Sequence, residues 1–62
     1  MNYIKLHDID NDKNIVLVNF NQVLYFTKDV YSKHTILFFE DRRTLFVLET
    51  IEEIENKIKE AK

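Results

Sequence analysis

The chain of 62 residues contains no cysteine, no glycine and no proline. Without cysteine, neither disulfide bonds nor thiolate metal sites can stabilise the fold. Without glycine, every turn position that needs a positive φ must be taken by a residue such as Asp, Asn, Lys or Arg, so longer or bulged turns are favoured over tight two-residue ones. Without proline, strand edges lack one of the residues that block pairing with another chain.

Long apolar runs and strong charge of one sign are also missing. No segment approaches the roughly 18 apolar residues of a membrane-spanning helix, and residues 1–12 carry acidic side chains and lack the apolar stretch of a signal peptide. The net charge of −2 does not provide the basic field that nucleic-acid or anionic-membrane binding usually needs. We therefore expect a cytoplasmic protein that binds no membrane and for which nucleic acid is a disfavoured partner.

The composition nevertheless predicts a folded chain, since 45% of its residues are hydrophobic, including five Phe and three Tyr. A chain of this size folds as one domain, here residues 1–62, and buries only about 60% of the surface that the open chain exposes. Such a domain is marginally stable alone. Self-association is the simplest remedy, and a symmetric homodimer is the first expectation.

Alternating apolar and polar residues, β-branched runs and turn-forming segments predict an antiparallel β-meander of four or five strands. The acidic and amide-rich segment 8–14 predicts a hairpin connection, and the polar break at 19–22 predicts a corner or bulge. The expected strands are 3–8, 15–18, 23–27, 34–39 and 44–48.

The periodicity changes after the last expected strand. Ile51, Ile54 and Ile58 follow one another at steps of three and four, which places them on one stripe of an amphipathic C-terminal helix. Thr50 and Glu53 have the spacing of a capping box at its start. The predicted fold class is therefore α+β, with the meander followed by this single helix.

The last two strands are apolar on both faces, a pattern typical of strands that are covered on both sides. One short helix covers only one side, so we expect the other to bind a second copy or an unknown protein partner. The alternative is that the sheet curls and the N-terminal hairpin covers that face. The residues expected at the interface are Phe26, Leu37, Phe39, Phe46 and Leu48.

One acidic segment has the spacing of a metal-binding loop. Asp8, Asp10 and Asp12 match the first three ligand positions of an EF-hand loop, but Lys13 replaces its glycine and Asn19 its bidentate glutamate. A solvated acidic turn is the simpler interpretation, and neither a metal nor another cofactor is expected.

No arrangement of residues indicates catalysis. His7 and His34 have no ligand at a metal-binding spacing and are expected on strand surfaces, while the single serine, Ser32, lacks the glycine-rich elbow of a nucleophile. Glu49 and the glutamates that follow it are expected to form a solvated helix face. We therefore expect a protein that is not an enzyme.

A second function class comes from basic and aromatic residues. Arg42 and Arg43, together with Lys28 and Tyr31, offer the phosphate contacts and stacking surfaces that single-strand binders use. The alternative is a charged hairpin tip that keeps a sheet edge soluble.

The order of these segments, from Ile4-Lys5-Leu6 through Val23-Leu24-Tyr25-Phe26 to the stretch 45–54, resembles the FlbD-like small flagellar and swarming motility proteins along nearly the whole chain. The resemblance implies a similar fold and an accessory role in motility, and it implies no catalytic residues. That family usually carries glycine in its turns, where this chain has Asp10-Asn11-Asp12 and Asp41-Arg42-Arg43. The strand–strand–helix half is also similar to part of the LytTR DNA-binding domain, but the basic C-terminal strand of that domain is absent here.

Overall fold

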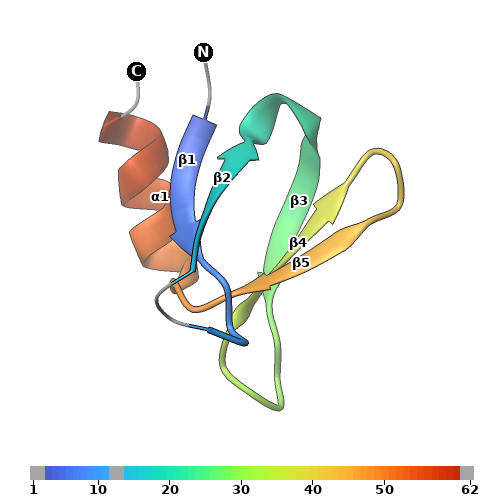
Figure 1. Ribbon diagram of the computed structural model, residues 1–62, viewed down its shortest axis with the longest axis vertical. Coiled ribbons are helices and arrows are strands. Elements are labelled where there is room, and N and C mark those ends of the chain that lie inside the picture. Colours follow the sequence, from blue (N-terminus) through green and yellow to red (C-terminus); the bar gives the residue numbers. More distant parts are fainter. Residues whose placement is uncertain (1–2, 12–13, 61–62) are drawn as a thin grey trace.

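The computed structural model describes residues 3–11 and 14–60, and it contains two antiparallel sheets and one C-terminal helix (Figure 1). The predicted α+β class is therefore confirmed. One sheet pairs β1 with β2, and the other has the order β3-β4-β5. The elements are β1 (Tyr3–His7), β2 (Ile15–Asn19), the 3₁₀ helix η1 (Phe20–Gln22), β3 (Val23–Lys28), β4 (Thr35–Phe39), β5 (Thr44–Val47) and α1 (Ile51–Glu60).

The corner predicted at 19–22 is confirmed as η1, and it divides the meander into two sheets. The side-chain oxygen of Asn19 accepts a hydrogen bond of 3.0 Å from the Asn21 N–H, which caps the short helix. The chain leaves η1 at Val23 and enters the second sheet.

The two sheets meet at one corner. Asp8, just after β1, forms an antiparallel bridge with Val47, and the Leu48 N–H donates a 2.9 Å hydrogen bond to the His7 carbonyl. The first and last strands therefore adjoin there, while the remaining strands diverge (Figure 1).

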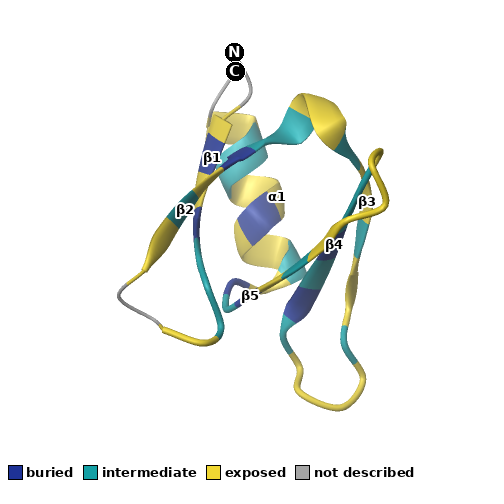
Figure 2. Ribbon diagram, turned by 45° about the vertical axis from the view of Figure 1, so that its right-hand side comes forward, coloured by how far each residue is buried: buried dark blue, intermediate teal, exposed yellow. Residues whose placement is uncertain are grey.

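The core lies between the two sheets and α1, and each of these layers contributes to it (Figure 2). Ile54 of α1 is fully buried, and Ile58, one turn further on, packs against the same cluster, as their spacing predicted. No helix in the described part of the chain is both long and apolar enough to cross a membrane. The buried apolar residues are Ile4, Leu6, Val18, Leu37, Val47 and Ile54.

Two turns have a residue other than glycine at a positive φ. Arg42 has φ 72° and Lys33 has φ 64°, so basic residues occupy left-handed positions, as the composition predicted. In the β4–β5 turn, the Phe39 N–H donates to the Arg43 carbonyl (3.0 Å) and the Arg42 N–H to the Phe39 carbonyl (3.1 Å). This is the three-residue hairpin connection in which glycine is usual at the last position.

The capping box is also confirmed. The Glu53 N–H donates to the Thr50 hydroxyl at 3.1 Å, and the Thr50 N–H donates to the Glu53 carboxylate at 2.9 Å. Two helix N-terminal donors are thereby satisfied, which fixes the point at which α1 begins.

Candidate interaction surfaces

The face of the β3-β4-β5 sheet that points away from the core is uncharged. The strand register places its residues in two rows, one across Tyr25, Phe38 and Thr44, the other across Thr27, Ile36 and Phe46. None of these side chains carries a charge, and Lys28, the one charged residue within the three strands, lies at the end of β3 on the other face by the same register. We call these six residues the outer aromatic face.

The rings on the outer aromatic face are ordered and accessible. Tyr25 and Phe38 stack with centroids 4.5 Å apart and planes 16° from parallel. Tyr25 is 56% exposed and Phe46 36% exposed. Because an aromatic side chain offers about 150–250 Å², these two rings alone expose roughly 200 Å² of surface.

The structure places the predicted interface residues mostly on the opposite face. Leu37 pairs with Phe26 and Leu45 on the inner face and is fully buried, so it is not available to a partner. Phe26 and Phe39 pack partly against the core, and Leu48 is half-buried, which leaves Phe46 as the predicted residue that lies on the outer face. The N-terminal hairpin and α1 both pack on the inner face, so the hairpin does not cover the face opposite the helix, as the curled-sheet alternative expected it to.

A histidine–glutamate pair, which sequence reasoning missed, lies where the two sheets meet. The His7 ring Nδ1 is 2.6 Å from one Glu49 carboxylate oxygen, and the His7 backbone N–H donates to the other oxygen at 2.9 Å. Glu49 was expected on a solvated helix face, but it is buried just before α1, and its carbonyl accepts from the Thr35 hydroxyl at 2.7 Å. That expectation was wrong because the chain turns inward between β5 and α1.

Two opposing effects act on the Glu49 carboxyl. Burial raises the pKa of this carboxyl. The hydrogen bonds from the His7 ring and the His7 backbone N–H together lower it by more than burial raises it, so the net pKa lies below the ordinary glutamate value. Glu49 is therefore held as a carboxylate that joins β1, β4 and the segment before α1.

The cleft beside this pair has a volume of about 330 Å³ and is also lined by Leu48, Glu53 and Lys57. Its two carboxylates already have structural partners, since Glu53 caps the helix and Glu49 binds His7. Ser32 does not line the cleft, because it lies in the β3–β4 loop and donates a 2.6 Å hydrogen bond to Asp29.

The acidic loop after β1 forms a turn. The Asp10 N–H donates to the Asp8 carboxylate at 3.0 Å, while Asp12 lies outside the described residues. In the ranges 3–11 and 14–60, no three His, Cys, Asp or Glu side chains gather in a way that could hold a metal ion.

The four residues proposed for nucleic-acid contact lie at opposite ends of one sheet. Lys28 ends β3 and Tyr31 lies in the β3–β4 loop, whereas Arg42 and Arg43 lie at the β4–β5 tip (Figure 1). The five residues of β4 separate the two places by roughly 15 Å. Tyr31 is 94% exposed and stands apart from the outer aromatic face. The Arg43 guanidinium is paired with Asp41 at 2.6 Å, which reduces the local positive charge.

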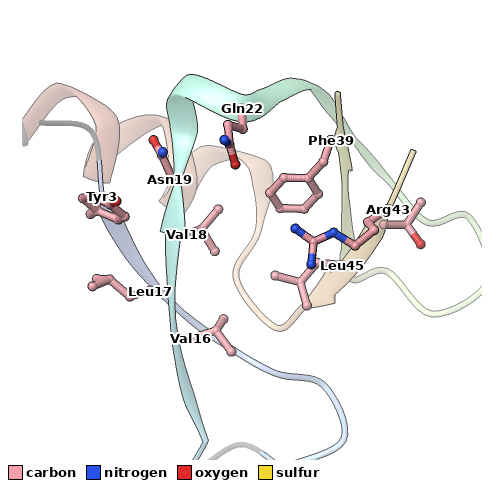
Figure 3. Close-up of a pocket in the computed structure, with 10 residues that line it drawn as sticks. Tyr3, Val16, Leu17, Val18, Asn19, Gln22, Phe39, Arg43 and Leu45 are labelled. Atoms are coloured by element: carbon pink, nitrogen blue, oxygen red, sulfur yellow. The ribbon is translucent and has the colours of Figure 1, made fainter. Parts of the chain in front are cut away.

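An apolar groove of about 320 Å³ opens between β2 and the β4–β5 hairpin. Figure 3 shows Val16 and Val18 on one wall and Phe39 and Leu45 on the other, with Arg43 near the opening. The groove therefore lies between the facing sheets, and a free edge of β2 borders it.

Comparison with protein-family models, with curated proteins and with solved structures found no match for this chain. The resemblance to FlbD-like proteins therefore stays a prediction from the sequence pattern.

Proposed function

We propose that this chain is a non-catalytic protein-interaction module that binds a protein partner through its outer aromatic face. The observation that carries the proposal is the absence of charge from a face that includes four apolar side chains, two of them aromatic rings in a stack. On a protein with 32% charged residues, an uncharged sheet face is a marked exception.

The fold does not require these apolar side chains. The core is made by the inner face, where Leu37 and Val47 are fully buried, and none of the outer-face side chains belongs to the core cluster or packs against it. Aromatic residues are enriched among the residues that dominate binding energy at interfaces. A stacked pair also loses little side-chain entropy when a partner packs on it.

The proposed setting is the cytoplasm, and the proposed role is that of an accessory protein. The sequence resemblance to FlbD-like motility proteins agrees with this role and contributes no catalytic residues. Nucleic-acid binding is less well supported, since the four candidate residues do not form one surface and Arg43 is paired with Asp41.

Site-specific photo-crosslinking in the native cells tests the proposal. A benzoylphenylalanine placed at Phe46 is expected to give a discrete adduct with one protein, and the same probe at Tyr31, exposed but outside the face, is the matched control. The adduct should disappear when Tyr25→Glu is added. Adducts of equal yield at both positions, or none at Phe46, would contradict the proposal.

A stability measurement separates loss of binding from loss of the fold. Phe46→Glu and Tyr25→Glu should change the free energy of unfolding by less than about 1 kcal/mol, as is usual for exposed positions. If either variant were unfolded, the outer aromatic face would be part of the folded core and would have to be reinterpreted.

A further inference from the structure

β2 has the sequence pattern of an internal strand but lies at an edge. Val16 and Val18 point into the groove, and Val18 belongs to the core. Ile15 and Leu17 point the other way and are 57% and 61% exposed. Within the described residues β1 is the one strand that pairs with β2. Strands that are apolar on both faces are usually covered on both faces, whereas the outward side of β2 is exposed.

The unpaired edge of β2 offers ordered hydrogen-bonding groups. The Asp8 N–H donates to the Asn14 carbonyl at 3.1 Å. Every second residue from Asn14, namely Val16 and Val18, therefore directs its backbone N–H and C=O toward β1. By the alternation of an antiparallel ladder, Ile15 and Leu17 direct their N–H and C=O groups toward the open edge, whereas Asn19 at the strand end also caps η1. Five consecutive residues without proline or charge thus form a template for another strand.

The other sheet edges are less suitable for pairing. β3 contains a bulge between Val23 and Tyr25, and α1 lies close to this strand. β5 is joined at its end to β1 through the bridge between Asp8 and Val47. β2 is the regular edge strand, and the apolar groove lies next to it.

We infer that a second copy of this chain pairs its own β2 antiparallel along this edge, which makes a four-stranded sheet in the order β1-β2-β2-β1. A two-fold axis through Leu17 would pair the whole of Ile15–Asn19 with itself. Leu17 then lies opposite Leu17 of the other copy on one face, where Ile15 lies opposite Asn19, and Val16 lies opposite Val18 on the other face. Because β2 carries no charge, self-pairing brings no like charges together.

This inference goes beyond the proposed function, because it concerns a different surface. Dimerisation through β2 leaves the outer aromatic face of each copy free, so one dimer presents two such faces. A bivalent module binds a partner with two sites more tightly than one copy does, without any new contact.

Light scattering on a sizing column, over a series of protein concentrations, tests the inference. The wild-type chain should have the mass of a dimer, and Leu17→Pro should have that of a monomer, because it removes an N–H directed at the open edge. Leu17→Lys keeps the backbone donor and adds a charge, and it should also weaken the dimer. It serves as the second test in case the proline variant does not fold. Leu24→Lys, equally exposed but in the β3 bulge, is the matched control and should stay dimeric.

Crosslinking supplies the register. Since the chain has no cysteine, a single Leu17→Cys variant should form a disulfide-linked dimer under mild oxidation, whereas Tyr31→Cys should not. A wild-type monomer at all concentrations, or a dimer that both Leu17→Pro and Leu17→Lys leave intact, would overturn the inference. A dimer lost in Phe46→Glu but kept in both Leu17 variants would also overturn it, and would make the outer aromatic face the contact between copies.

Discussion

His7 and Glu49, 42 positions apart in the chain, are joined twice: through the imidazole Nδ1 at 2.6 Å and through the His7 backbone N–H at 2.9 Å. The Glu49 backbone carbonyl takes a third hydrogen bond, from the Thr35 hydroxyl of β4. One buried glutamate therefore connects β1, β4 and the segment that leads into α1.

Replacing Glu49 by glutamine should lower the free energy of unfolding by about 1–3 kcal/mol near pH 7, because hydrogen bonds to a charged acceptor are lost in a buried site. The folded-state pKa of Glu49 lies below its ordinary value of 4.5, so its stabilising contribution is present above about pH 4.5 and is lost as the pH falls through the folded-state value. Denaturant unfolding of both proteins between pH 3 and pH 7 checks this. The gap between the two curves should narrow at the acidic end, and a constant gap would contradict the assignment.

Arg42→Gly should stabilise the protein by up to about 1 kcal/mol, because glycine adopts φ 72° without the steric cost that arginine bears there. The midpoint of thermal unfolding reports the change. Glu40→Gly, in the same turn but without a positive φ, is the control and should lower stability, since it adds unfolded-state entropy and removes no strain. A lower midpoint for Arg42→Gly would mean that its side chain makes a larger contribution than the turn geometry indicates.

Thr50→Ala should cost about 1 kcal/mol and reduce the helical signal in circular dichroism, because the Glu53 N–H loses its side-chain acceptor. Thr50→Ser keeps a hydroxyl at the same position and should retain most of the stability. Equal losses in both variants would place the effect in the threonine methyl group and not in the cap.

Substitutions on the two faces of β4 should differ sharply although the residues are neighbours. Leu37→Ala should destabilise by about 2–5 kcal/mol because the side chain is fully buried, whereas Phe38→Ser should cost much less, since Phe38 faces outward against Tyr25. Chemical denaturation of both variants measures the difference. Similar losses would show that the outer aromatic face contributes to folding as well as to binding.

Local signals in the sequence were sufficient to predict the elements, with the end of each strand placed to within one residue. The capping pair at Thr50 and Glu53, the corner before Val23 and the positive φ at basic turn residues all depend on short-range chemistry. Such features are determined by neighbouring residues, and the pattern indicates them directly.

Long-range placement could not be predicted in the same way. β4 and β5 are apolar on both faces, so alternation alone did not reveal that Leu37 points inward and Phe38 outward; that depends on the register with β3 and on what α1 covers. The His7–Glu49 pair gave no signal either, because its two residues are brought together only when the first and last strands meet.

The bonds made by Glu49 also bear on how the molecule opens. The bond between His7 and Glu49 closes a loop of 42 positions, which forms more slowly than a local hairpin. The junction between β1 and the segment before α1 should therefore be among the last contacts to form during folding. Once formed, it ties β1 and the segment before α1 to the central strand β4. In native-state hydrogen exchange, the amides of β1 and the first turn of α1 should therefore become exposed together, as one cooperative unit, rather than each terminus fraying by itself.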